Sequence, residues 1–241
     1  MRERSRKGAF PLLRKDYMFT IRPAVKDDAV SIQDLFNHKD VIAFLGGFVL
    51  KDQILGKVND TKRCSMFVAE LDMQIVGALE IAGRTQAHFM KYGMVAVFPE
   101  HRRKRIASSL YAAATFQGIL EGRRLFEDTI VGDNPVQFHL LPTIGLVDNV
   151  NLQHKTAIGK DIHLFSFDLL LDGTFDKIVS RLSVEKLEKM ILIKGSYQAD
   201  LWEKNQTIYR DSEFVDSQFH AVISSYREKI LSNVLVSTLE V

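Results

Sequence analysis

The hydrophobic and polar positions of the chain predict strands and helices that follow one another from residue 19 to about residue 171. One helix is expected to begin after Asp27 or Asp28, either of which can cap it, and another after Asp133-Asn134-Pro135. Leu71-Asp72-Met73 separates two apolar runs, as expected of a hairpin turn. The apolar stretch 38–55, broken at Gly46-Gly47, indicates an irregular helical piece with a mobile loop. Apolar runs predict strands over 19–22, 65–70, 74–81, 92–98, 125–131 and 162–171, and the longest helical pattern covers 105–121.

The pattern changes after Gly173 and becomes helical in character. Thr174, Ser183 and Ser212 are placed as helix caps, and the last precedes an apolar stripe. Core packing is the ordinary role of such a stripe, and contact between copies in a homo-oligomer is the alternative. The stripe consists of Val215, Phe219, Val222, Ile223, Tyr226 and Ile230. We therefore expect a basic arm over 1–17, an α/β domain over 18–172 and a helical extension over 173–241.

The composition is that of a globular protein with a substantial core. Of the 241 residues 46% are hydrophobic and 26% charged, and the net charge of +2 is too small to indicate a nucleic-acid partner by itself. We expect no membrane span, because no apolar run approaches the roughly 18 residues that one needs. The basic first residues lack the apolar stretch of a secretory signal. The single cysteine, Cys64, excludes an internal disulfide, suits a reducing cytoplasm, and is expected to be a small packed residue.

Four consecutive cations, Arg102 to Arg105, stand between a strand that ends at Pro99 and the start of a helix. Unpaired N–H groups and the positive end of the dipole lie at a helix N-terminus, so cations there cost about 0.3–1 kcal/mol each near the surface. An anion bound at this point would explain them. Ala107 leaves room for a phosphate, and Ser108 can add a hydroxyl donor. The alternative is a solvated basic loop.

This stretch resembles the acyl-CoA-binding motif of the GNAT acetyltransferase superfamily: Arg or Gln, two residues, Gly, one residue, then Gly or Ala. Arg102, Arg105 and Ala107 take those places, and Asn134 with Gly145-Leu146 resembles the family's Asn…Gly-Phe pattern. The resemblance implies an α/β (α+β) fold with a mixed, mostly antiparallel sheet flanked by helices, and acetyl-CoA as the acyl donor. The implied CoA-binding residues are Val95, Ala96 and Val97 beside the pantetheine arm, then Arg102, Arg103, Lys104, Arg105, Ile106, Ala107, Ser108 and Asn134.

Three positions depart from the family pattern. Arg105 replaces the motif glycine, Leu141 stands where many members have a tyrosine that acts as general acid, and Lys91 stands where some carry a carboxylate. Neither Leu141 nor Lys91 can act as acid or base at neutral pH. The resemblance therefore supports cofactor binding more directly than catalysis.

Other residues could move the protons of acetyl transfer. Glu80 is the candidate base and Tyr92 the candidate acid, with His139 as a possible relay. A surface glutamate, a packed aromatic ring and a helix-surface histidine are the ordinary alternatives. A backbone N–H near Ala96 or Val97 can polarise the thioester carbonyl. The histidines are scattered, so no metal site is expected.

We therefore predict an acyl-CoA-dependent N-acyltransferase that transfers acetyl to an amine, with the loop at 45–57 and the helical tail shaping the acceptor side. Two alternatives stay open. One is a catalytically degenerate GNAT domain that binds acyl-CoA or serves in regulation. The other is a nucleic-acid-directed protein that uses Arg102–Arg105, Arg123-Arg124 and the basic arm.

Overall fold

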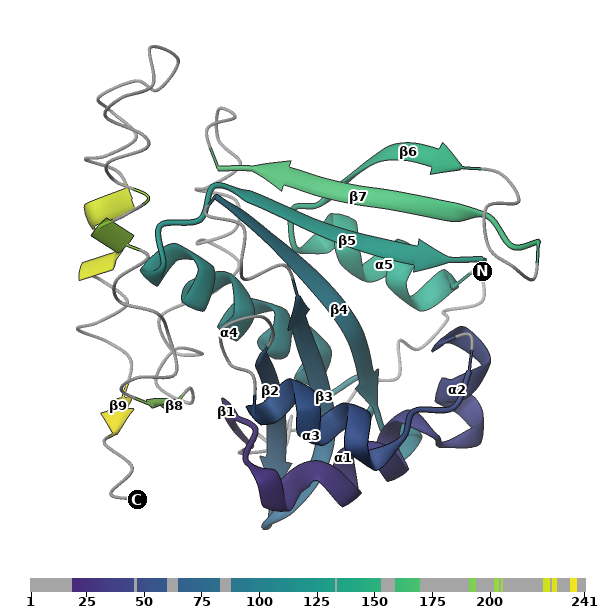
Figure 1. Ribbon diagram of the computed structural model, residues 1–241. Coiled ribbons are helices and arrows are strands. Elements are labelled where there is room, and N and C mark those ends of the chain that lie inside the picture. Colours follow the sequence, from purple (N-terminus) through teal and green to yellow (C-terminus); the bar gives the residue numbers. More distant parts are fainter. Residues whose placement is uncertain are drawn as a thin grey trace, which may run out of the picture.

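A seven-stranded sheet forms the centre of the protein (Figure 1). The computed structural model describes residues 19–45, 47–59, 65–82, 88–132, 134–152 and 159–169, with short pieces at 191–193, 202–203, 205, 223–225, 227–228 and 235–237. The strand order is β1-β2-β3-β4-β5-β7-β6, and every neighbouring pair is antiparallel except β4 and β5. The sheet strands are β1 (Thr20–Pro23), β2 (Ser65–Leu71), β3 (Gln74–Ala82), β4 (Phe89–Val97), β5 (Leu125–Val131), β6 (Val147–Leu152) and β7 (Ile162–Asp168).

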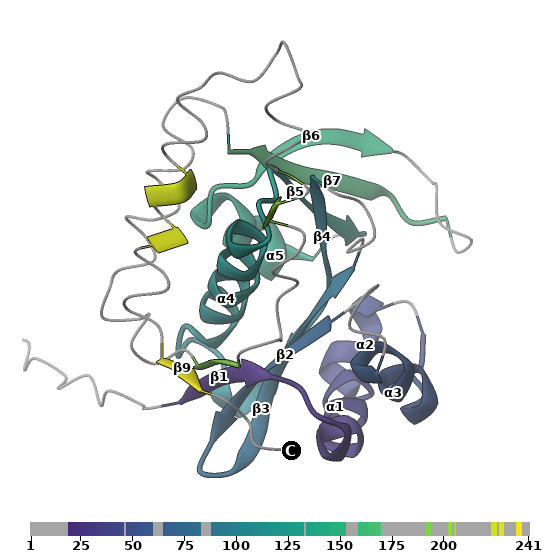
Figure 2. The same ribbon diagram turned by 60° about the vertical axis from the view of Figure 1, so that its left-hand side comes forward.

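Helices cover both faces of this sheet, which confirms the predicted fold class (Figure 2). α4 packs against β2, β3 and β4 on one face, while α1 and α3 lie on the other. Along β3, Leu79 and Ile81 face the α4 side and Ala78 faces the α1 side, so both faces of the strand carry apolar side chains. The helices are α1 (Ala29–Phe36), α2 (Lys39–Leu45), α3 (Lys51–Asn59), α4 (Ile106–Leu120) and α5 (Pro135–Thr143), with 3₁₀ turns at Lys26–Asp28 and Pro99–His101.

The β2–β3 hairpin lies where the sequence predicted it. Leu71 pairs with Gln74, and the two turn residues, Asp72 and Met73, have φ of 51° and 61°. Positive φ at both central residues is the geometry of a type I′ turn, whose twist matches that of the strands.

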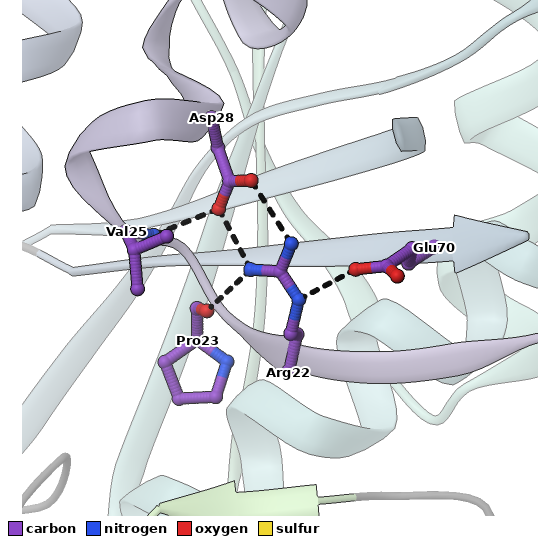
Figure 3. A network of polar contacts seen from close by, with 5 residues as sticks. All are labelled: Arg22, Pro23, Val25, Asp28 and Glu70. Carbon is purple, nitrogen blue, oxygen red and sulfur yellow. Dashed lines mark hydrogen bonds and ion pairs between the residues drawn. The ribbon is translucent and has the colours of Figure 1, made fainter. Parts of the chain in front are cut away.

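Arg22 ties the first strand to its neighbour and to the start of α1 (Figure 3). Its guanidinium donates to both oxygens of Asp28 at 2.7 and 2.9 Å and to Glu70 Oε2 at 2.7 Å. Asp28 Oδ2 also accepts from the Val25 N–H at 2.8 Å. Asp28 therefore lies at the helix boundary, as expected, but its carboxylate is engaged on the strand side and makes no cap bond to α1.

Three strands were not predicted from the sequence. β6 contains Asp and Asn in a sequence without regular alternation, and it forms by pairing with β7, which itself ends at Asp168 rather than at residue 171. In the C-terminal segment, β8 (Ile191–Ile193) and β9 (Leu235–Ser237) pair in parallel, and β8 lies beside β1. The described residues at 202–203, 205, 223–225 and 227–228 are helical. The 1–17 arm, Cys64 and most of the predicted apolar stripe lie outside the described residues.

Candidate functional site

Strands β4 and β5 separate and leave an opening in the middle of the sheet (Figure 1). They pair only from Phe89 with Leu125 to Lys91 with Glu127. Beyond that point β4 contains a bulge, because Leu79 pairs with Val95 and Ile81 with Tyr92, so that Glu80 opposes two residues. Bulges redirect a strand, and the β5-facing edge of β4 is thereby turned toward the opening.

A cleft of about 1120 Å³ occupies this region between β4, α4, α5 and α2. Its walls include ten of the eleven residues that the resemblance implied for CoA, and Lys104 is the exception. The lining also includes residues that the sequence did not single out, namely Asp40, Val41 and Phe44 of α2, Tyr111, Ala112 and Thr115 of α4, and Val136, Gln137, Leu140 and Thr143 of α5. No residue of the predicted 45–57 loop is among the described lining residues.

The basic turn has an unusual backbone. Arg103 and Arg105 have φ of 62° and 63°, in the left-handed region that glycine adopts without strain. Arg105 is the N-cap of α4, and no side chain caps this helix end. The first N–H groups of α4 have no intrahelical acceptor, so uncapped donors face the cleft beside the side chains of Arg103 and Arg105. This geometry fits an anion.

The other residues of the turn have protein partners. Arg102 Nε donates to the carbonyl of Val97 at 3.2 Å and so holds the turn against the end of β4. The hydroxyl of Ser108 donates to the carbonyl of Arg105 at 2.8 Å, so its proton is already engaged. Lys104 places Nζ 3.2 Å from His101 Nδ1, and it lies outside the cleft lining.

Asn134 caps α5 at the opposite wall. Its Oδ1 accepts from the N–H of Gln137 at 3.3 Å and its Nδ2 donates to Gln137 Oε1 at 3.1 Å, while Pro135 occupies the first helical turn. Asn134 therefore positions α5 at the cleft and orients Gln137. His139, the suggested relay, is exposed and lines the same wall.

The structure does not bring the predicted base and acid into this cleft. Glu80 is 8% exposed and forms an ion pair with Lys57 of α3 at 2.6 Å. It lies over Gly93, where a Cβ atom would come within 2.9 Å of its side chain. Tyr92 is 1% exposed, and its hydroxyl lies 2.6 Å from Thr115 Oγ1. Of Tyr92 and Thr115, only Thr115 is among the residues that line the cleft.

A hydrogen-bonded tyrosine–aspartate pair, of which Tyr111 lines the cleft, was missed by sequence reasoning. Tyr111 of α4 lines the cleft and donates a hydrogen bond to Asp128 Oδ2 of β5. Burial raises the pKa of Asp128 to about 7, although the bonds from Tyr111 and from the Thr129 N–H oppose that rise. Burial likewise raises the pKa of Tyr111. The available signal was the alternation of β5, in which Asp128 shares the buried face with Phe126 and Ile130.

The proposed nucleic-acid footprint loses two of its cations. Arg123 has a fully buried side chain paired with Glu121 at 3.1 Å, and Arg124 pairs with Asp168 at 2.7 Å.

Leu141 is fully buried, and Lys91 lies 3.5 Å from Glu127. The part of the chain that the structure describes contains no cluster of potential metal ligands and no helix long and apolar enough to cross a membrane.

Comparison with known proteins agrees with this geometry. Residues 26–135 match the profile of the Acetyltransferase (GNAT) family. Among solved structures, an N-acetyltransferase from Staphylococcus aureus Mu50 is similar at 20% identity and a TM-score of 0.56, covering 63% of this chain and 98% of that one. A YncA structure from Salmonella typhimurium with acetyl-CoA has 18% identity and a TM-score of 0.56, covering 63% and 94%.

A variant of the spermidine N-acetyltransferase of Vibrio cholerae is also similar, with 16% identity and a TM-score of 0.54 over 66% of this chain and 96% of that one. These identities show a shared fold. A search of curated proteins found no match.

Proposed function

We propose that the protein transfers an acetyl group from acetyl-CoA to an amine, since residues 26–135 match the profile of the Acetyltransferase (GNAT) family. The observation that carries the proposal is the position of the 102–107 turn. It opens α4 at the mouth of the cleft, where the two strands of the sheet separate.

The turn suits the diphosphate of CoA for two reasons. Uncapped N–H groups at the start of α4 supply donors and the positive end of the helix dipole. Arg103 and Arg105 add positive charge at the same wall. Ala107, with only a methyl side chain, lets an anion approach the backbone.

The edge of β4 suits the pantetheine arm, which contains two amides. Val95, Ala96 and Val97 line the cleft beyond the short stretch in which β4 pairs with β5. A strand edge offers N–H and C=O groups to an extended ligand, as in strand addition. A backbone N–H there can also polarise the thioester carbonyl.

The reaction is a direct transfer in this proposal. A neutral amine attacks the carbonyl carbon of the thioester, the C–S bond breaks, the nitrogen loses a proton to water and the sulfur gains one. The acceptor is an amine of undefined class. Asp40 is the one carboxylate among the described lining residues, which provides little attraction for a polycation such as spermidine.

Binding tests the cofactor part of the proposal. Acetyl-CoA is expected to raise the melting temperature, because a ligand that binds only the folded state stabilises it. The double variant Arg103→Glu and Arg105→Glu reverses two charges at the turn, and we expect at least a 10-fold loss of affinity by calorimetry. Lys51→Glu, an exposed change on α3 outside the cleft lining, is the matched control. Unchanged affinity in the double variant would remove the turn from the site.

Activity separates the enzyme from a degenerate binder. Lys91 and Leu141 at the family's acid and base positions favour that alternative. Thiol release from acetyl-CoA is measured over amines, polyamines including spermidine, and peptides. Binding of acetyl-CoA without thiol release from any acceptor would support the degenerate domain.

A further inference from the structure

Two tyrosines approach the floor of the cleft from different directions, and their hydroxyl groups have different partners. Tyr111 comes from α4 and Tyr92 from β4, and their rings pack edge to face with centroids 5.0 Å apart. Tyr111 is among the lining residues and Tyr92 is not. The bonds beyond each hydroxyl decide which of them can deliver a proton.

The hydroxyl of Tyr92 is bonded to a group that cannot supply a proton. Thr115 Oγ1 donates to the carbonyl of Tyr111 at 2.8 Å, so the 2.6 Å contact between Tyr92 and Thr115 must have Tyr92 as its donor. Neither the threonine hydroxyl nor a peptide carbonyl ionises near neutral pH. The groups that follow Tyr92 in this hydrogen-bond chain therefore cannot replace a proton that Tyr92 gives away.

The hydroxyl of Tyr111 leads to a carboxyl group. Asp128 is 1% exposed, its Oδ2 meets Tyr111, and its Oδ1 accepts from the Thr129 N–H at 2.7 Å. When Asp128 is ionised, the phenol proton points at Oδ2. When Asp128 holds a proton on Oδ2, it can donate to the phenol oxygen and free the phenol proton for the cleft.

The surroundings keep that proton available near neutrality. Asp128 titrates with a pKa of about 7 because burial outweighs its two hydrogen bonds and the nearby Lys91, while Glu127 on the same strand opposes ionisation further. Tyr92 and Gln137 face Tyr111 from β4 and α5. On β7, the residue paired with Asp128 is Phe165, which has no charge.

We propose that Tyr111 protonates the departing thiolate of CoA and that Asp128, acting through Tyr111, resupplies the proton. This rests on the acetyl transfer proposed above. As the C–S bond breaks, the sulfur takes the phenol proton of Tyr111, and the phenolate oxygen takes the proton of the Asp128 carboxylic acid. Asp128 regains a proton from solvent before the next turnover, and the proton lost by the amine leaves to water.

The test measures kcat and KM for acetyl-CoA by thiol release, with an amine from the panel that the wild type accepts. Tyr111→Phe is expected to lower kcat about 10- to 100-fold, within the range for a positioned general acid. Its KM for acetyl-CoA, melting temperature and affinity for CoA should stay within about 2-fold or a few degrees of wild type. Tyr92→Phe removes the rival phenol and is expected to leave kcat within about 2-fold.

The pH profile tests Asp128 as a positioning residue. The ratio of wild-type kcat to that of Asp128→Asn cancels the ionisation of the amine, which is common to both proteins. We expect this ratio to be largest near pH 6 and to fall toward one as pH rises through about 7, where the wild type loses the Asp128 proton. A ratio that does not vary with pH would reduce Asp128 to a packing role and overturn the relay.

The remaining outcomes separate this relay from the function on which it rests. Absence of thiol release by the wild type with every amine overturns both. Wild-type activity that survives in folded Tyr111→Phe, or that is lost in Tyr92→Phe instead, overturns the relay and leaves the acetyltransferase in place.

Discussion

The two ends of α4 carry charged residues in opposite circumstances. At the N-terminal end, Arg103 and Arg105 are exposed at a cleft, in strained backbone and beside uncapped N–H groups. At the C-terminal end, Glu121 and Arg123 are buried and bonded to each other. Charge that is satisfied within the fold stabilises a particular arrangement, whereas charge left at a cleft is available to a ligand.

The C-terminal end is closed by several interactions at once. Gly122 has a φ of 72°, its N–H donates to the carbonyl of Ile119, and the N–H of Arg123 donates to that of Gly118, which is a Schellman motif. Arg123 also donates to the carbonyl of Phe89 at 2.8 Å. From the C-terminal segment, Asn205 Nδ2 donates to the carbonyl of Glu121 at 2.6 Å.

The same segment contributes Trp202, which is 8% exposed and belongs to the main core cluster. The guanidinium of Arg227 lies 4.7 Å from its ring centroid. Trp202 and Asn205 thus lie at the end of α4 that is away from the cleft, close to Gly122.

The largest expected effect is at the buried end. Arg123→Met removes the positive charge beside the buried carboxylate of Glu121, and we expect a loss of about 3–5 kcal/mol in the free energy of unfolding. Urea denaturation measures it. Arg124→Met is the matched control, because its ion pair with Asp168 is partly exposed and should contribute about 1 kcal/mol or less. Equal losses in the two variants would show that burial does not distinguish these pairs.

An intermediate effect is expected from Asp128 of β5, which accepts a hydrogen bond from Tyr111 of α4. Its pKa is 3.8 when unfolded and about 7 when folded, so the folded state holds the extra proton between these values. Stability from this group is therefore greatest below pH 4 and falls as pH rises toward 7. Asp128→Asn should remove this dependence. The free energy of unfolding of the variant, relative to that of the wild type, should rise by on the order of 3 kcal/mol between pH 4 and 8. Melting temperatures across this range measure it; parallel curves would contradict the assignment.

The smallest effect is expected at the strained end. Arg105→Gly relieves a left-handed conformation that costs a non-glycine residue about 1–2 kcal/mol, but adds about 0.5–1 kcal/mol of backbone entropy loss. We expect a net gain of about 0.5–1 kcal/mol. Arg102→Gly, with φ of −64°, has no strain to relieve and should lose stability. The sign of the difference between these two variants, measured by urea denaturation, decides the point.

Much of the cleft could be predicted because its residues are consecutive in the sequence. The strand ending at Pro99, the basic turn and the helix from Ile106 form one local unit, and ten of eleven implied CoA residues lie at one cleft. Arg105 was identified as a departure from the motif glycine, and its φ of 63° shows why glycine suits that position.

The sequence by itself determined the alternation of strands and helices and the basic helix start, because hydrophobic periodicity and turn residues act over a few positions. Tertiary structure alone decided which phenol reaches the cleft, because Tyr92 and Tyr111 are both apolar-face positions of their elements. It also decided that Arg123 is buried while its neighbour Arg124 is not. Burial and a partner distant in sequence, such as Asp128 or Asn205, set the chemistry of these groups, and no local pattern encodes that proximity.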